Sequence, residues 1–165
     1  MPFIASLSLA IAIVALLFST RKEAHHVRLE LSKPNNYSLV LGVNNDSAVA
    51  FGILSVGHFQ SAEKIEWIEK IGSYTNNKFI DYPIRVDARS LLALELSPWR
   101  NNTHNKKFGI CVQLETGRIY ILNNTLSFRE SIKPQVSAFI SRLTRGKFAP
   151  GISIRPRLPF NPNNH

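Results

Sequence analysis

Two residues with the chemistry of a protein interface stand side by side in a polar stretch of this sequence. Trp99 and Arg100 lie near the start of the segment SPWRNNTHNKK, residues 97–107, which separates two apolar runs and is expected to form a long loop. Trp and Arg are enriched among the residues that dominate binding energy at interfaces, and loops on rigid scaffolds carry function. We therefore take Trp99 and Arg100 as candidate partner-binding residues. The alternative is that Trp99 folds back and caps the predicted sheet.

A second candidate site is basic and lies in the C-terminal quarter of the chain. Residues 129–165 contain seven Lys or Arg and one acidic residue, and they hold most of the formal charge of +9. Basic side chains interleaved with Phe148 can track a polyanion. We expect anionic lipid headgroups or an acidic protein surface rather than nucleic acid, because the tail offers few aromatic platforms for bases. The candidate residues are Arg142, Arg145, Lys147, Arg155 and Arg157.

Motifs for catalysis, metals and nucleotides are weak. His25 and His26 follow Glu23, but adjacent side chains point to different faces of a helix or strand, and two imidazoles make an incomplete metal site. The eight glycines are scattered, and none forms a phosphate-binding loop. Glu66 and Glu69 are expected on a solvated face. We therefore predict a non-enzymatic protein without cofactor or metal. The alternative is a small enzyme whose site is assembled from residues distant in sequence.

The single cysteine, Cys111, lies inside the apolar run of residues 108–114. One cysteine excludes an intramolecular disulfide. A small and weakly polar side chain in such a run is expected in the core rather than at the surface as a reactive thiol.

The N-terminus is apolar on every helical face. Residues 3–18, FIASLSLAIAIVALLF, contain no charge and two serines. Sixteen helical residues reach about 24 Å of the roughly 30 Å hydrocarbon core, and Arg21 and Lys22 can snorkel to the headgroups. We expect residues 1–22 to form a single-pass transmembrane anchor that contacts lipid through residues 3–18. The alternatives are a cleaved signal peptide, which would need a positive start and a small-residue cleavage site, and a buried core helix.

The charges after this segment bear on its orientation. Arg21, Lys22 and Arg28 follow it and no charged side chain precedes it, so the positive-inside tendency places the folded domain in the cytoplasm. Four N-x-S/T triplets would be glycan acceptors in a secretory lumen, but Asn-Asn pairs produce such triplets by composition alone. They begin at Asn36, Asn45, Asn101 and Asn123.

Alternating hydrophobicity predicts a strand-rich domain over residues 23–128. The predicted strands lie within residues 27–32, 37–43, 48–56, 79–86, 91–96, 108–114 and 119–121. The turn residues 44–46 predict a hairpin between 37–43 and 48–56, and Thr116 with Gly117 predicts one between 108–114 and 119–121. Pro83 is expected at an edge or a bulge, because proline cannot donate to a strand ladder.

Residues 61–72, SAEKIEWIEKIG, allow two structures. Ile65, Ile68 and Ile71 recur every three residues and Gly72 suits a helix C-terminus, which favours a short helix. The alternative is a bulged strand with Ile65 and Trp67 on one face.

The pattern becomes helical after residue 128. Residues 129–146 are predicted to form an amphipathic helix whose apolar face holds Val136, Phe139, Ile140 and Leu143. Pro134 is expected in its first turn and Gly146 just past its end. Residues 147–165 contain four prolines and are expected to form an exposed basic tail.

The order of these segments resembles that of membrane-anchored immunoglobulin-like domains. The likeness covers residues 27–122: YSLVLGVN before an Asn-rich turn, a YPIRV segment, and a closing QLETGRIY hairpin. The resemblance implies a mainly β, antiparallel immunoglobulin-like sandwich, although the Cys-Trp-Cys framework of true immunoglobulin domains is absent. We expect a single-pass, membrane-tethered binding or structural module, whose partner is another membrane or envelope protein. Nucleic-acid binding through the tail is a further alternative.

Overall fold

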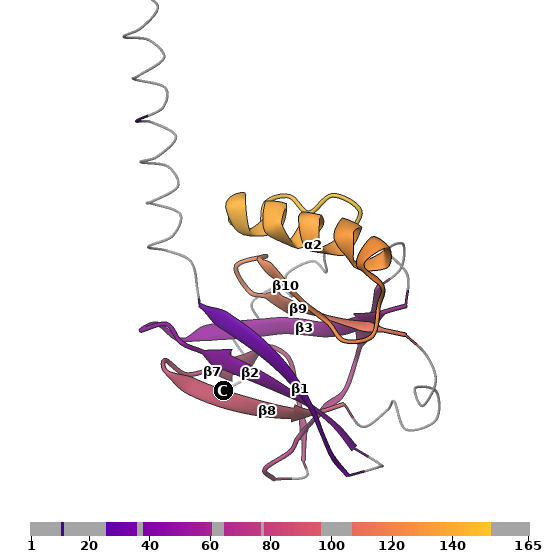
Figure 1. Cartoon of the computed structure of the whole chain (residues 1–165). Coiled ribbons are helices and arrows are strands. Elements are labelled where there is room, and N and C mark those ends of the chain that lie inside the picture. Colours follow the sequence, from indigo (N-terminus) through magenta and orange to yellow (C-terminus); the bar gives the residue numbers. More distant parts are fainter. Residues whose placement is uncertain are drawn as a thin grey trace, which may run out of the picture.

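The structure, a computed structural model, describes residue 11 and residues 26–35, 38–60, 65–76, 78–96 and 107–152. Most of these residues form two antiparallel β-sheets that face each other, and helix α2 (Phe128–Leu143) lies against the outer side of the second sheet (Figure 1). The predicted mainly β fold with a short C-terminal helix is confirmed for these residues.

The first sheet has the strand order β1-β2-β8-β5-β6. Every neighbouring pair in it is antiparallel. A register shift near the end of β1 coincides with Pro34, as expected for a residue that cannot donate to the ladder. The strands are β1 (Val27–Asn35), β2 (Ser38–Asn45), β8 (Ser90–Glu95), β5 (Ile71–Ser73) and β6 (Phe79–Ile80).

The second sheet has the strand order β10-β9-β3-β4, with β7 also paired to β3. Its longest strand, β3, pairs with β9 along most of its length and with β7 at its beginning. β10 is an edge strand, as β1 is in the first sheet. The strands are β10 (Ile119–Asn123), β9 (Gly109–Leu114), β3 (Phe51–Phe59), β4 (Ile65–Ile68) and β7 (Ile84–Val86).

The main apolar cluster lies between the two sheets. Leu41 and Val43 of β2 face it from the first sheet, and Ile53, Val56 and Val112 face it from the second. Each of these side chains is completely buried, and such burial contributes roughly 1.5–3 kcal/mol per side chain. The period of two in the sequence therefore marks the inner faces correctly.

The hairpin predicted between residues 37–43 and 48–56 is wrong. β2 pairs with β1 and β8, whereas β3 belongs to the second sheet, so residues 46–50 cross between sheets. Asn45 holds this crossing. Its buried amide donates to the carbonyls of Val49 (2.9 Å) and Asp87 (2.8 Å), and its Oδ1 accepts from Ser47 N (3.0 Å). The side-chain amide of Asn45, which begins one of the four N-x-S/T triplets, is thus buried and hydrogen-bonded in the fold.

The helix favoured over residues 61–72 is also wrong in the described part of that segment. β4 and β5 occupy it, and Trp67 lies opposite Gly57 of β3. Ile65 and Trp67 pack on the side of the sheet that faces α2, whereas Ile68 and Ile71 enter the cluster between the sheets. The spacing of three thus divides the isoleucines between two cores. The alternative, strand structure with Ile65 and Trp67 on one face, is confirmed, but as two strands in different sheets and not as one bulged strand.

The segment around Pro83 is split as its proline predicts. Residues 79–86 give two short strands, β6 and β7, in different sheets, and the Tyr82–Pro83 peptide bond between them is cis. The hairpin predicted at Thr116 and Gly117 is confirmed as β9-β10, with Gly117 at φ +82°.

The transmembrane prediction falls where little is described. Residues 3–18 lie outside the described residues except Ile11, which is helical and exposed. Among the residues that are described, none of the helices has both the length and the apolar character that a bilayer crossing requires.

Candidate docking surface on helix α2

Helix α2 begins at a capping interaction. The carboxylate of Glu130 accepts hydrogen bonds from the backbone N–H of Ser127 (2.9 Å) and from its hydroxyl (2.7 Å). These hydrogen bonds hold the pKa of Glu130 below its usual range, so the carboxylate stays ionised near the positive end of the helix dipole. Because the helix starts at Phe128, Pro134 lies in its interior, which corrects the first-turn prediction.

The face of α2 that packs on the sheet is made of small residues. The buried positions are Ser131, Pro134, Ser137, Ala138 and Ser141. They cover a second apolar cluster on the outer side of the second sheet, and Cys111 is part of it. Small side chains let the helix backbone lie close to the sheet, so the proline and serines that weaken a helix in isolation are tolerated here.

The C-terminal end of α2 is fixed on the β9-β10 turn. Ser141 Oγ donates to the carbonyl of Gly117 (3.1 Å). The backbone then turns through Arg145 and Gly146, both at positive φ, and Gly146 N donates back to the Ser141 carbonyl (2.7 Å). This is the Schellman arrangement that ends many helices. It places Arg145 in the left-handed position, one residue before the predicted glycine.

The large apolar residues of α2 point away from the sheet. Val136, Phe139 and Leu143 of the predicted apolar face expose 51%, 54% and 42% of their surfaces. Ile140 is partly buried. At about 100° per residue, the exposed side chains fall within roughly 80° of one another and opposite the buried face. We call this stripe the α2 outer face: Phe128, Ile132, Val136, Phe139 and Leu143.

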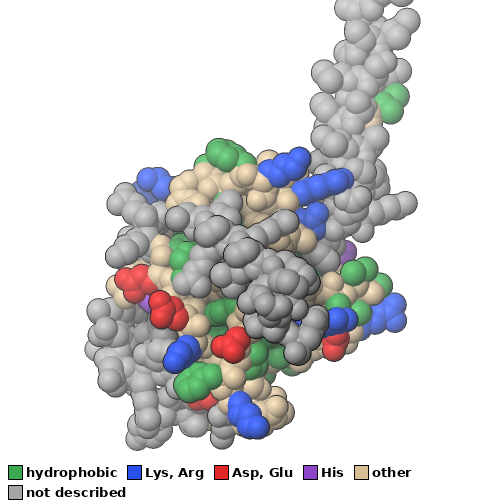
Figure 2. Space-filling model, turned by 180° about the vertical axis from the view of Figure 1, so that it is seen from behind, with side chains coloured by type: hydrophobic (Ala, Val, Ile, Leu, Met, Phe, Trp, Pro, Cys, Tyr) green, Lys and Arg blue, Asp and Glu red, His purple; other side chains and the backbone are tan. Residues whose placement is uncertain are grey.

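Basic side chains border the α2 outer face on both sides. Arg129 and Lys133 lie along one border, and Arg142 lies along the other, by the same helical spacing. Arg145 and Lys147 follow at the C-terminal end, and both are exposed. Figure 2 shows the molecule from behind, with α2 at the top. Several Lys and Arg side chains lie in this upper part beside a hydrophobic side chain, and the Asp and Glu side chains lie lower.

The guanidinium of Arg142 has a defined position. Its centre lies 5.5 Å from the centroid of the Tyr120 ring, and its Nε donates to the carbonyl of Ala138 (3.3 Å). Burial raises the pKa of Tyr120, and the charges of Arg118 and Arg142 oppose that rise. The aromatic ring attracts the cation above its face, and the guanidinium N–H groups that remain free of the Ala138 carbonyl can donate to an anion.

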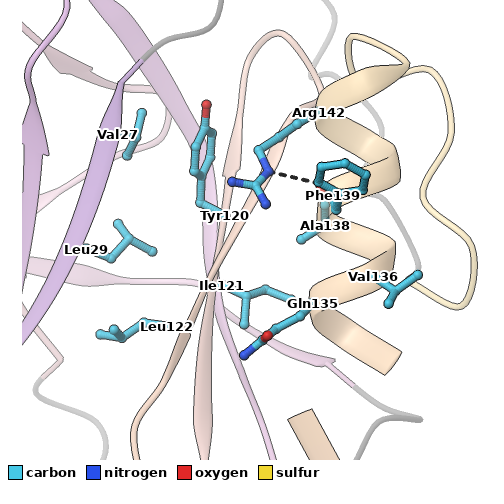
Figure 3. Close-up of a pocket in the computed structure, with 10 residues that line it drawn as sticks. All are labelled: Val27, Leu29, Tyr120, Ile121, Leu122, Gln135, Val136, Ala138, Phe139 and Arg142. Carbon is cyan, nitrogen blue, oxygen red and sulfur yellow. Dashed lines mark hydrogen bonds between the residues drawn. The ribbon is translucent and has the colours of Figure 1, made fainter. Parts of the chain in front are cut away.

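A groove of about 500 Å³ runs between β1, β10 and α2. Val27 and Leu29 of β1 form one wall, Tyr120 and Leu122 of β10 form the floor, and Arg142 reaches over it from the helix (Figure 3). Among the described residues that line the groove, Arg142 is the one with a charge. The beginning of β1 therefore lies beside the C-terminal half of α2.

The structure brings together part of the predicted basic site. Arg142, Arg145 and Lys147 gather at the C-terminal end of α2. The other candidates, Trp99, Arg100, Arg155 and Arg157, lie outside the described residues.

Few groups with catalytic chemistry meet within the described ranges. Among the residues in these ranges, no cluster of three or more His, Cys, Asp or Glu could hold a metal ion. His25 and Glu23, which the sequence places beside His26 as an incomplete metal site, lie outside the described residues. His58 Nε2 lies 3.1 Å from the Glu66 carboxylate across β3 and β4. Burial lowers the pKa of His58, and Glu66 opposes that change. Cys111 is completely buried, as predicted.

Comparison with protein-family models gives no match to this chain, and comparison with curated proteins gives none either.

The α2 outer face was partly missed from the sequence. Phe128 and Ile132 extend the spacing of Val136, Phe139 and Leu143 toward the N-terminus, so the whole stripe is visible as a periodic pattern. The sequence also shows the opposite stripe of Ser, Pro and Ala. Hydrophobicity alone would assign the larger residues to the core. In the structure the small residues are buried instead, and the larger ones are exposed.

Proposed function

We propose that this chain is a single-pass, membrane-tethered and non-enzymatic binding module with an immunoglobulin-like sandwich. Residues 1–22 would anchor it, and the sandwich with α2 would present a contact surface on the cytoplasmic side. The uncharged sequence of residues 3–18 supports the anchor, and Arg21 and Lys22 after it support the orientation.

The strand order supports the immunoglobulin-like part of the proposal. Immunoglobulin constant domains place strands A, B, E and D in one sheet and C, F and G in the other. If β1 to β3 correspond to A to C, then β1-β2-β8-β5 matches A-B-E-D and β10-β9-β3 matches G-F-C. Cys111 of β9 faces α2 rather than the space between the sheets, so it differs from the cysteine of the usual inter-sheet disulfide.

The observation that carries the binding function is the α2 outer face. Phe128 and Phe139 expose 78% and 54% of their surfaces, and three aliphatic side chains continue the stripe. Scattered exposed apolar residues are ordinary, but a continuous stripe on one helix marks a contact site. The helix already has its packing face on the opposite side, so the stripe is not needed to hold the fold together.

Two measurements on the full chain test the proposal. In carbonate-washed membranes the full chain should stay in the pellet, and the same chain begun at residue 23 should be released. A photoreactive benzoylphenylalanine replacing Phe139 should form adducts in these membranes, with protein or lipid. The same group replacing Phe79, which is 68% exposed on edge strand β6, serves as the control. Equal adduct yields at both positions would overturn the binding function.

A further inference from the structure

The structure points to the occupant of this surface: we propose that the α2 outer face and its basic borders lie on the anionic headgroups of the membrane that anchors the chain. This inference rests on the proposed function and names the partner of the same surface. The sandwich would then rest on the membrane through α2, with Phe139 and Val136 below the headgroups and the basic residues among the phosphates.

The chemistry of α2 fits the interface between water and hydrocarbon. Helices that lie in that interface combine an apolar stripe with a basic polar face. Here Phe139, at the middle of the stripe, has a basic border on each side, formed by Lys133 and Arg142. Phe148, which is 58% exposed just beyond the helix, adds an apolar side chain at the same end.

The charges favour an anionic surface over a neutral one. Between residues 127 and 152 the basic residues are Arg129, Lys133, Arg142, Arg145 and Lys147, against one acidic residue. That acidic residue, Glu130, is engaged with Ser127 at the start of the helix. An acidic border would be repelled by phosphatidylserine, whereas each basic side chain near the surface is attracted to it.

Chain length places the membrane within reach of α2. The apolar segment ends at residue 18, and the groove that holds Arg142 and Phe139 is lined at its other wall by Val27. Residues 18 and 27 are nine residue steps apart, so the two points lie at most about 32 Å from each other when the chain is fully extended. Because Val27 lies across the groove from Arg142 (Figure 3), this reach also limits how far the C-terminal half of α2 can lie from the end of the anchor.

The test uses the full chain in vesicles and a fluorophore on α2. An environment-sensitive nitrobenzoxadiazole dye is attached to Phe139→Cys, or in a matched control to Phe79→Cys, because Cys111 is completely buried. Vesicles contain phosphatidylcholine and phosphatidylserine at 3:1, with or without brominated acyl chains. We expect bromine to quench the dye at position 139 at least threefold more than at position 79. Equal quenching at both positions would overturn the inference.

Charge variants test whether the basic residues beside the stripe bind the anionic headgroups. Arg129→Gln, Lys133→Gln and Lys147→Gln together remove three exposed charges beside the stripe. The control, Lys33→Gln with Lys70→Gln and Lys78→Gln, removes three exposed charges elsewhere. The first triple should lose at least half of the quenching at position 139, and the control should retain it. If pure phosphatidylcholine vesicles quench the dye equally well, the anionic surface is the wrong occupant.

The two proposals fail in different ways. In one case, the dye at position 139 is not quenched, but benzoylphenylalanine at position 139 forms protein adducts that are absent at position 79. The surface then binds a protein, and only the inference about lipid is wrong. If carbonate releases the full chain from the membranes, the proposed membrane anchor in residues 1–22 is wrong. Circular dichroism on each labelled variant separates loss of contact from loss of fold.

Discussion

Gly117 and Gly146 meet through their backbones at the point where α2 ends on the β9-β10 turn. A Cβ atom on Gly117 would lie 2.7 Å from the carbonyl oxygen of Gly146, and both glycines have positive φ. Neither position has room for a side chain, and the conformation at both is one that side chains disfavour. The contact fixes the direction in which α2 presents its outer face.

Replacing Gly146 with alanine should therefore destabilise the domain strongly. Its Cβ would collide with the backbone of Thr116 and Gly117, so the turn and the helix end must separate. We expect Gly146→Ala to lower the free energy of unfolding by about 3 kcal/mol, from the clash and the positive φ together. Urea unfolding of residues 23–165, which retain both apolar clusters, measures the change.

Gly151 provides the matched control for that substitution. Its φ is +74°, but a Cβ there would meet no atom within 4 Å. Gly151→Ala should therefore cost only the conformational part, about 1 kcal/mol. Equal losses at positions 146 and 151 would show that the contact between helix and turn contributes nothing.

Two buried serines on the packing face of α2 should respond in opposite ways. Ser137 Oγ has no hydrogen-bond partner among the described residues, whereas Ser141 Oγ donates to Gly117 O at 3.1 Å. Ser137→Ala should raise the free energy of unfolding by about 1 kcal/mol, and Ser141→Ala should lower it by about 1 kcal/mol. Thermal unfolding of both variants measures the two changes in stability. A loss of stability in Ser137→Ala would mean that its hydroxyl is hydrogen-bonded after all.

Strands and turns were the part of the fold that the sequence predicted well. The alternation in residues 108–114 and the turn at Gly117 specify a hairpin locally, because each strand face and each turn residue is read from neighbours in sequence. The partner of β2 was predicted wrongly, because a hairpin with residues 48–56 was expected. Asn45 and its neighbours form a turn in either case, and whether the next strand pairs with β2 or crosses to another sheet depends on contacts with residues 86 and 87, far along the chain.

The orientation of α2 shows why the site was harder to predict than the fold. Its sequence has two stripes, one of large apolar residues and one of small residues, and burial of the large stripe is the expected choice. The close approach of Gly117 to Gly146, and the bond from Ser141, require the small stripe instead. That requirement involves a turn that lies more than twenty residues away, so no local pattern reveals it.

His58 should make stability depend on pH on the acid side. Burial lowers its pKa below the ordinary value of about 6.5, so the unfolded chain binds a proton that the folded chain does not. The free energy of unfolding should therefore fall as pH drops through about 6.5, and level off below the folded pKa. Urea unfolding at pH 7.5 and 5.5 measures this, and His58→Gln should remove this part of the loss.

Glu66 should limit that effect, because its carboxylate lies 3.1 Å from His58 Nε2 and favours the protonated ring. Glu66→Gln should lower the pKa of His58 further and increase the acid-side loss of stability. An NMR titration of the His58 ring signals reports the shift directly. A higher pKa in Glu66→Gln would contradict the assigned role of the carboxylate.

Cys111 should be inert until the domain unfolds. Its side chain is completely buried under α2, and burial raises the pKa of its thiol, which suppresses the reactive thiolate. Iodoacetamide should therefore label the folded chain at less than about a hundredth of the rate seen in guanidinium, as expected when reaction needs opening of the structure. Mass spectrometry over time gives both rates. Labelling at similar rates would show that α2 leaves the sheet readily.

The α2 outer face should be separable from folding by substitution. Phe139 is 54% exposed, so Phe139→Ser should change the free energy of unfolding by no more than about 0.5 kcal/mol. Ala138, its neighbour, is 2% exposed against the sheet, so Ala138→Leu should overpack the interface and cost about 2 kcal/mol. Urea unfolding of residues 23–165 compares the two variants. If Phe139→Ser lowers the free energy of unfolding as much as Ala138→Leu does, the α2 outer face stabilises the fold. Its exposed apolar residues would then no longer indicate a contact site.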